Sequence, residues 1–262
     1  MATITQHAVG TFCWPELATI DQPRARSFYT QLFGWDVREQ DMGEAGTYTL
    51  LRKDDRDVGA LYQLSKDQRE QGVPPHWLSY VAVDSADRAA EQAVRLGAKP
   101  IMAPLDVYDI GRMAVLEDPQ GAVFALWQAK KHIGAGVLDE IGSLCWTELQ
   151  TRDTAAARRF YGGLFGWAVE EMPMGPATYT LFKRDHKPAG GMMAIAPLMG
   201  PMPPNWLVYF SVDDCDTTVA KAIMAGGKVV VAPQSAPGVG RYAVMTDPQG
   251  AHFAMLAKEK RE

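Results

Sequence analysis

The chain has 262 residues, of which 47% are hydrophobic, with a formal net charge of −5 and a pI near 5.6. This composition supports a full hydrophobic core and argues against a disordered, fibrous or nucleic-acid-binding class. No apolar run approaches the ~20 residues of a membrane span and the start lacks a signal-peptide pattern, so we expect a cytoplasmic protein, monomer or homodimer, whose partner is a small-molecule ligand, with no nucleic acid and no membrane.

The sequence contains a long internal repeat. The segment 12–17 recurs at 144–149, 26–35 recurs at 158–167, and 118–121 recurs at 247–250. We therefore predict a first module at 8–129, a linker at 130–141 and a second module at 142–258. A functional residue of one module is expected to have a counterpart in the other.

Each module is predicted to contain two similar units of strands and a helix. In the first unit, a strand at 11–17 precedes a helix that Asp21 caps and Gly34 ends, and strands at 47–52 and 59–64 flank a polar turn. The second unit has a strand at 76–83, a helix at 87–96 ended by Gly97, and strands near 101, at 112–116 and at 123–127. The second module repeats this order, which indicates an α+β class.

The motif Phe28-Tyr29 with Leu32-Phe33-Gly34, preceded by Asp21 and followed much later by Asp118-Pro119-Gln120-Gly121, resembles the vicinal oxygen chelate superfamily of glyoxalases, bleomycin-resistance proteins and extradiol dioxygenases. The resemblance covers both modules. It implies that each module has two βαβββ units forming an eight-stranded, cup-shaped mixed sheet with helices on the outer face. It also implies that a divalent metal often lies at the floor of such a cup.

The metal-binding positions that this resemblance implies hold no usual ligands. They correspond to Trp14, Leu78 and Ala125 in the first module and to Trp146, Leu207 and Ala254 in the second. A catalytic divalent ion ordinarily needs about three O or N donors, so we expect no metal and no other cofactor. A divalent metal at a displaced site is the alternative, with Glu16 and His76 or Glu148 and His252 as ligands, although each pair lacks a third donor.

The equivalent residues Glu16 and Glu148 are the predicted catalytic groups. Each lies in an otherwise apolar strand, where a buried carboxylate without a partner is costly. Each is therefore either a general base, a metal ligand or an acceptor for a substrate hydrogen bond, or a structural group satisfied by backbone amides or by an arginine such as Arg112 or Arg241.

Alternation along the strands at 76–83 and 205–212 separates a more polar face, the predicted cup, from an apolar face. The two arginines follow long loops at 104–111 and 233–240, from which they would reach an anionic or carbonyl group. The predicted ligand-binding residues are Trp14, His76, Tyr80, Arg112, Trp146, Asn205, Tyr209, Arg241 and His252.

The remaining tryptophans, cysteines and histidines are not among the predicted ligand-binding residues. We assign the remaining paired tryptophans and the three cysteine thiols to the core: Trp35, Trp77, Trp167, Trp206, Cys13, Cys145 and Cys215. Three histidines, His7, His132 and His186, are expected to be exposed. The Met- and Pro-rich stretch at 197–204 is expected to form a hydrophobic lid or an interface.

Two functions compete. The favoured one is a small-molecule pocket of the glyoxalase or bleomycin-resistance type that binds a hydrophobic or aromatic ligand without a metal. The alternative is a glyoxalase-like enzyme, a lyase, isomerase, hydroxylase or dioxygenase, acting on a small carbonyl or aromatic compound with Glu16 or Glu148 as base or metal ligand. We expect the two cups to bind different ligands, or only one of them to bind. No phosphate loop, GxSxG elbow or CxxC pair is present.

Overall fold

The computed structural model describes residues 4–174, 177–196 and 200–259. The first half of the chain contains β1 (Phe12–Thr19), α1 (Gln22–Phe33), β2 (Asp36–Asp41), the 3-10 helix η1 (Gly43–Ala45), β3 (Thr47–Lys53), β4 (Arg56–Gln63), α2 (Lys66–Glu70), β5 (His76–Ala82), α3 (Ala86–Arg95), β6 (Lys99–Val107), β7 (Gly111–Glu117) and β8 (Val123–Ala129). The second half contains β9 (Leu144–Thr151), α4 (Thr154–Phe165), β10 (Ala168–Met174), β11 (Ala177–Arg184), β12 (Lys187–Ala194), β13 (Asn205–Ser211), α5 (Cys215–Met224), β14 (Lys228–Ala236), β15 (Gly240–Thr246) and β16 (His252–Lys258).

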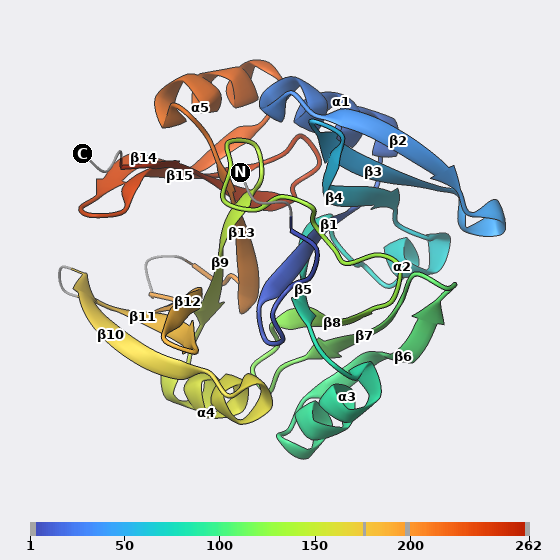
Figure 1. Ribbon diagram of the computed structural model, residues 1–262. Coiled ribbons are helices and arrows are strands. Elements are labelled where there is room, and N and C mark those ends of the chain that lie inside the picture. The colour runs from blue at the N-terminus through green and yellow to red at the C-terminus, as the bar shows by residue number, and fades with distance from the viewer. Residues whose placement is uncertain (1–3, 175–176, 197–199, 260–262) are drawn as a thin grey trace.

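Each half forms one eight-stranded mixed sheet (Figure 1). The strand order is β2-β3-β4-β1-β5-β8-β7-β6 in the first sheet and β10-β11-β12-β9-β13-β16-β15-β14 in the second. In the first, β1 pairs parallel with β4, β5 pairs parallel with β8, and β1 and β5 join the two units in antiparallel fashion. The α+β fold with two cup-like sheets, each built from two βαβββ units, is thus confirmed. Among the described helices, none is long and apolar enough to cross a membrane.

Local signals placed the first helix of each module correctly. The Asp21 carboxylate accepts from Arg24 N at the start of α1, and Gly34 ends the helix in the left-handed region at φ 70°. In α4, Asp153 and Gly166 have the same roles. The predicted loops at 104–111 and 233–240 are wrong in part, because their first four residues lie in β6 and β14. These are edge strands, where proline is tolerated because one side of the backbone has no partner strand.

The helix-bearing faces of the two sheets pack against each other. One large apolar cluster contains residues of both modules, α1 contacts α5, and α3 contacts α4. Across the boundary, the Phe12 ring lies 4.9 Å from the ring of Trp206, and Phe33 lies 5.1 Å from Phe210. The core assignment of the four tryptophans is confirmed, because Trp35, Trp77, Trp167 and Trp206 are all buried in this cluster. The cup faces consequently point away from each other.

Hydrogen bonds of the Asp-Pro-Gln-Gly turns tie the modules together reciprocally. The Tyr29 hydroxyl donates to Asp247 Oδ2 (3.2 Å) and accepts from Trp77 Nε1 (3.0 Å). The equivalent network joins Tyr161 to Asp118 (2.9 Å) and Trp206 to Tyr161 (2.8 Å). In this chain the tyrosine and aspartate of the repeated motifs therefore meet across the module boundary rather than within one module.

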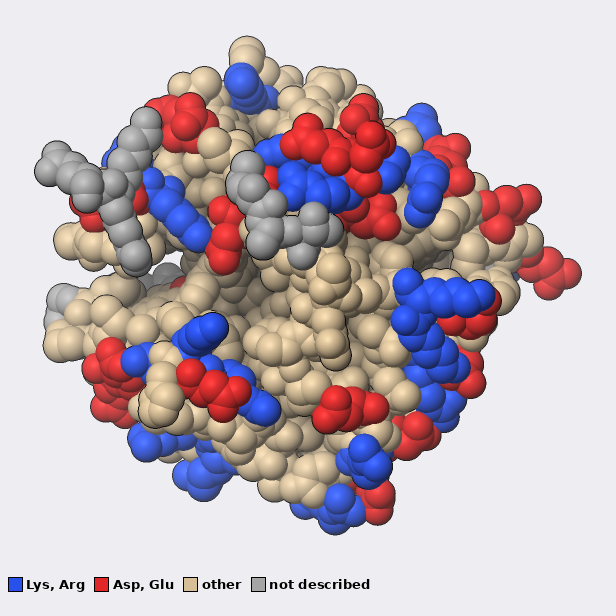
Figure 2. Space-filling model, in the orientation of Figure 1, with Lys and Arg blue, Asp and Glu red and all other residues tan. Residues whose placement is uncertain are grey.

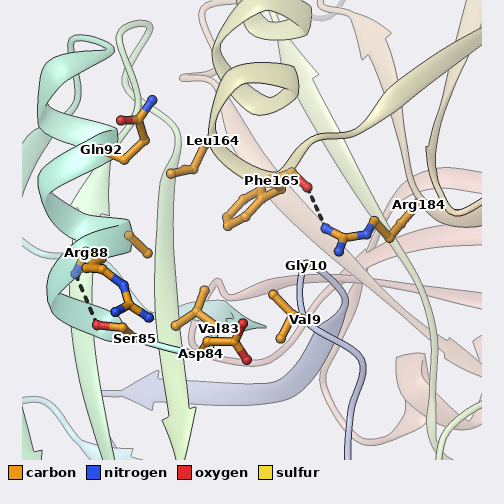
Figure 3. Close-up of a pocket in the computed structure, with 11 residues that line it drawn as sticks. Val9, Gly10, Val83, Asp84, Ser85, Arg88, Gln92, Leu164, Phe165 and Arg184 are labelled. Carbon is orange, nitrogen blue, oxygen red and sulfur yellow. Dashed lines mark hydrogen bonds between the residues drawn. The ribbon is translucent and has the colours of Figure 1, made fainter.

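Two shallow hollows follow the boundary, outside both cups. One, of about 250 Å³, lies between the ends of α3 and α4, and its lining includes Val83, Arg88, Leu164 and Arg184 (Figure 3). There Arg184 Nη1 donates to the carbonyl of Phe165 (2.8 Å). The other, of about 220 Å³, is lined by the equivalent residues at the ends of α1 and α5. The two are related by the repeat and hold no cluster of catalytic groups among the residues that line them.

Candidate functional site

The cup face of each sheet carries the glutamate that the sequence singled out. Trp14, Leu78 and Tyr80 belong to one apolar cluster on the cup face of the first module. Trp77 and Val81, which alternate with them along β5, lie in the cluster between the modules. In the second cup, Leu207 and Tyr209 of β13 form the equivalent cluster with Trp146 beside them. Trp14 and Trp146 therefore face the cups.

In the first cup, Glu16 is 8% exposed and its two oxygens are held by tyrosines. The Tyr48 hydroxyl donates to Oε1 (2.6 Å) and the Tyr80 hydroxyl donates to Oε2 (2.7 Å). Trp14 Nε1 in turn donates to the Tyr48 hydroxyl (3.4 Å). Burial raises the pKa of Glu16, and the two hydroxyl donors partly oppose that shift. The carboxylate is thus satisfied by neutral hydroxyl groups.

The second cup repeats this arrangement and adds amide groups. Glu148 is 5% exposed and accepts from the Tyr209 hydroxyl (3.1 Å) and from Gln150 Nε2 (3.4 Å). Trp146 Nε1 donates to the Tyr179 hydroxyl (2.8 Å). Burial raises the pKa of Glu148, whereas hydrogen bonds from Tyr179, Tyr209 and Gln150 lower it. A carboxyl group whose proton affinity is raised by burial is suited to accept a hydrogen bond or a proton from a ligand.

A glycine on β12 makes room for this network. Gly191 pairs with Glu148, and a Cβ at this position would lie 1.9 Å from the Tyr179 hydroxyl and 2.8 Å from Trp146 Nε1. In the first module the equivalent residue is Ala60, which pairs with Glu16. The Tyr179 hydroxyl can therefore lie over the strand in the second cup only because residue 191 lacks a side chain.

The linker closes one end of the first cup. Ala135 N donates to the carbonyl of Cys13 (2.7 Å), and the His132 ring packs between Trp14 and Trp127 with centroid distances of 4.9 and 6.1 Å. Trp127 Nε1 also donates to the carbonyl of His132 (2.9 Å). In Figure 1 the yellow-green linker passes beside β1 on its way from β8 to β9. Trp14 is consequently buried, at 5% exposed.

The second cup has no such cover among the described residues. Trp146 and Cys145 are half-buried, whereas Trp14 and Cys13 of the first cup are buried. In Figure 2 the surface is hollowed at the left, where Figure 1 places β14 and β15 above β10 to β12. The second cup is thus the more accessible of the two.

These contacts correct several expectations. His132 and His7 were expected to be exposed, but both are half-buried because the tail and the linker pack on the first module; His7 Nε2 lies 2.8 Å from the carbonyl of Ala135. His186 is exposed as expected. Cys13 and Cys215 are buried as expected, whereas Cys145 is only half-buried. Of the expected lid at 197–204, residues 197–199 lie outside the described part of the chain.

The two arginines do not lie in the cups. Arg112 forms a two-bond ion pair with Asp87 at the start of α3 (2.7 Å for each contact), and Arg241 pairs with Asp216 at the start of α5. The alternative in which these arginines neutralise Glu16 and Glu148 is therefore wrong. The reason is the period of two along a strand, because Met113 faces the cup and its neighbour Arg112 must face the helices.

The remaining candidates lie at the ends of strands on the cup side. Asn205 Nδ2 donates to Gln150 Oε1 (3.3 Å) and is thereby linked to Glu148. His76 Nδ1 lies 2.8 Å from the carbonyl of Pro74, and His252 is exposed at the start of β16. Burial lowers the pKa of His76, and partial desolvation of the ring by its neighbours lowers that of His252.

A divalent metal, which the resemblance implies, does not fit either cup. Within the described part of the chain, no three His, Cys, Asp or Glu side chains come close enough to share an ion. Across the first sheet, Trp14 is the strand partner of Tyr80, and Tyr80 is the strand partner of Ala125. None of these three side chains carries a carboxylate or an imidazole. The oxygens of Glu16 are both taken by tyrosine hydroxyls. The donor set is one for hydrogen bonding rather than for ion binding.

Comparison with known proteins places the chain in a family. Residues 6–126 and 143–255 match the model described as Glyoxalase/Bleomycin resistance protein/Dioxygenase superfamily. The chain belongs to this superfamily. The expected resemblance to glyoxalases, bleomycin-resistance proteins and dioxygenases is thereby confirmed.

Two kinds of relatives match the chain over nearly all of its length. It is 39% identical over 254 residues to "Putative glyoxylase CFP32" of Mycobacterium bovis, with 96% of each chain covered. It is 35% identical over 263 residues to "Anthracycline biosynthesis protein DnrV" of Streptomyces peucetius, with 97% of this chain and 95% of the relative covered.

Solved structures of the superfamily share the fold. The Mn(II)-bound glyoxalase of Novosphingobium aromaticivorans superposes with a TM-score of 0.65 at 15% identity, covering 96% of this chain and 83% of the other. A substrate complex of homoprotocatechuate 2,3-dioxygenase from Brevibacterium fuscum gives a TM-score of 0.65 at 17% identity, covering 95% and 81%. At this identity the similarity concerns the fold alone.

Several members of the two hydrogen-bond networks carry no local signal in the sequence that marked them as site residues. Tyr48, Tyr179 and Gln150 were not among the predicted site residues. The signal that could have found the tyrosines was their repetition at equivalent positions of β3 and β11, which pair with β4 and β12, the neighbours of the glutamate strands. No local pattern indicated Gln150, because its counterpart is Ala18.

Proposed function

We propose that the protein binds a flat, hydrophobic small molecule in the cup of its second module and needs no resident metal ion to do so. The observation that carries the proposal is the floor of this cup, where a buried carboxylate, Glu148, meets the Tyr209 hydroxyl beside the half-buried indole of Trp146. An apolar aromatic wall with a few convergent polar groups is the usual composition of a small-molecule site.

The polar groups define how such a ligand is held. Glu148 accepts hydrogen bonds only, as long as it is ionised, so it favours a ligand that presents a hydroxyl donor. Trp146, fixed by its bond to Tyr179, offers a ring face for a flat aromatic system. The name of one relative refers to the biosynthesis of anthracyclines, which are flat polycyclic aromatic compounds with hydroxyl and carbonyl groups, and this supports the same ligand class.

We assign binding to one cup because the linker covers the other. Glu16 and its two tyrosines repeat the polar floor, but His132 and Ala135 occupy the space beside Trp14. The proposal therefore predicts one ligand per chain.

Calorimetric titration of untagged protein, purified without chelators, with 2-hydroxyanthraquinone tests the proposal. We expect one site per chain, and Trp146→Leu is expected to weaken binding about threefold to tenfold, the range for an aromatic pair. The matched variant Trp14→Leu is expected to leave the affinity unchanged. Elemental analysis of the same sample completes the test, because a stoichiometric metal ion that Glu148→Gln releases would overturn metal-independent binding.

A second candidate function is proton transfer by Glu148 to or from the bound ligand, as in a glyoxalase-like lyase or isomerase. The observation that favours it is the buried position of the carboxylate, which raises its pKa. NMR detection of deuterium uptake at an acidic C–H position next to a ligand carbonyl would reveal it. Glu148→Gln is expected to abolish this exchange while binding persists, and exchange at the wild-type rate in that variant would rule Glu148 out as the base.

A further inference from the structure

The two cups differ at two pairs of equivalent positions, one on each side of the glutamate. At each pair, one cup has a tyrosine and the other has a methionine. On the β4 and β12 side, Tyr62 of the first cup is replaced by Met193 in the second; their strand partners are the equivalent residues Ala18 and Gln150. On the β7 and β15 side, Met113 is replaced by Tyr242, and their strand partners are Trp127 and Leu256. Each cup thus has one additional tyrosine, but on opposite walls.

Tyr242 faces the interior of the second cup. It packs against the cluster that contains Tyr209 and Leu207, and it is half-buried. The sheet order places Glu148 on β9 between the wall formed by β12 and the wall that contains β15. Burial raises the pKa of Tyr242, and the negative charge of Glu148 raises it further. The two groups therefore share one cup.

The Tyr242 hydroxyl accepts one hydrogen bond, which orients it, and its own proton remains able to donate another. Gln234 Nε2, from the neighbouring strand β14, donates to the Tyr242 oxygen (2.5 Å). Because the amide occupies the oxygen as an acceptor, the hydroxyl proton is left for another partner. Over the described ranges of the chain, no acceptor receives it, whereas the Tyr209 hydroxyl is committed to Glu148.

We propose that Tyr242, positioned by Gln234, determines the ligand specificity of the second cup by donating a hydrogen bond to an acceptor such as a carbonyl oxygen on the β15 side. This inference rests on the proposed function of the cup. The selected ligand is a flat aromatic compound with two polar groups: a hydroxyl that reaches Glu148 and a carbonyl that reaches Tyr242.

Two probes of one shape test the proposal. Both 2-hydroxyanthraquinone and 2-hydroxyanthracene carry the hydroxyl on three fused rings, but only the quinone carries carbonyl oxygens. The measured quantity is the ratio of their dissociation constants in calorimetry. Tyr242→Phe is expected to reduce the preference for the quinone about threefold to tenfold, as expected for one neutral hydrogen bond, with little change for 2-hydroxyanthracene.

The first module supplies the matched control. Tyr62 is the equivalent additional tyrosine of the covered cup, so Tyr62→Phe is expected to leave both dissociation constants unchanged. Gln234→Leu keeps the phenol and is expected to lose part of the preference, which a purely packing role of Tyr242 would not produce.

Three outcomes would overturn the inference. If both probes bind and Tyr242→Phe leaves their ratio unchanged, Tyr242 does not select the ligand, although the proposed function stands. A change of the ratio in Tyr62→Phe instead would assign selection to the first cup. If neither probe binds the wild-type protein, the proposed function fails together with the inference.

Discussion

The substitution Gly191→Ala tests whether the Tyr179 hydroxyl really occupies the space above β12. The added methyl group would lie 1.9 Å from that hydroxyl and 2.8 Å from Trp146 Nε1, whereas ordinary contacts begin near 3.4 Å. The hydroxyl must therefore move by about 1.5 Å, and its hydrogen bond with Trp146 is lost. The backbone of Gly191 does not require a positive φ, so the effect is confined to this contact.

The magnitude follows from three contributions. Loss of one hydrogen bond costs about 0.5–1.5 kcal/mol, and inserting a methyl group into packed space costs about 1–3 kcal/mol. Replacing glycine by alanine returns about 0.4–1 kcal/mol through the unfolded chain. Because the end of a half-buried tyrosine can swing outward, we expect a net destabilisation of about 1–2 kcal/mol.

Urea unfolding measures this change, and calorimetry with 2-hydroxyanthraquinone measures its effect on the second cup. The affinity is expected to fall because Trp146 loses the partner that orients its ring. The reverse substitution in the first module, Ala60→Gly, is the matched control and is expected to leave ligand affinity unchanged. A Gly191→Ala protein with wild-type stability and wild-type affinity would refute the arrangement of Tyr179 over Gly191.

Three further predictions concern the module boundary, the linker and the buried glutamates. Tyr161→Phe removes the hydroxyl that bonds to Trp206 Nε1 and to Asp118 Oδ2 in a buried site. The free energy of unfolding in urea is therefore expected to fall by about 2–4 kcal/mol. The control Tyr108→Phe, at a tyrosine that is 68% exposed, is expected to leave it unchanged. Gly134→Ala is expected to loosen the linker, since Gly134 has φ +106° and an added Cβ would lie 2.5 Å from the carbonyl of Cys13. Acrylamide quenching of tryptophan fluorescence should then be stronger than in the control Gly136→Ala, whose added Cβ has its nearest contact at 3.4 Å. Equal quenching in the two variants would contradict the closure of the first cup. Burial raises the pKa of Glu148 above its ordinary value of 4.5, so its contribution to stability is present below pH 4.5 and is lost as the pH rises through the folded-state pKa. In urea unfolding, Glu148→Gln should therefore gain stability relative to the wild type between pH 4.5 and 8. A relative loss of stability over this range would show that the folded-state pKa is not raised.

The sequence by itself determined the features that depend on neighbouring residues and on the repeat. Asp21 and Gly34 fixed the ends of α1 because a helix cap involves residues within one turn. The alternation along β5 separated the cup face from the core face because strand side chains alternate with a period of two. The repeat indicated two equivalent glutamates and two equivalent cups.

Only the tertiary structure decided which groups meet across long sequence separations. The sequence showed that Glu16 needs a partner and offered Arg112, but the strand order β3-β4-β1-β5 supplies the hydroxyls of Tyr48 and Tyr80 instead. The difference in accessibility between the two cups is also a tertiary feature, because the linker follows the first sheet in the chain and packs against Cys13. Such contacts depend on strand order and on docking of the modules, and neither is encoded in the spacing of residues along one strand or helix.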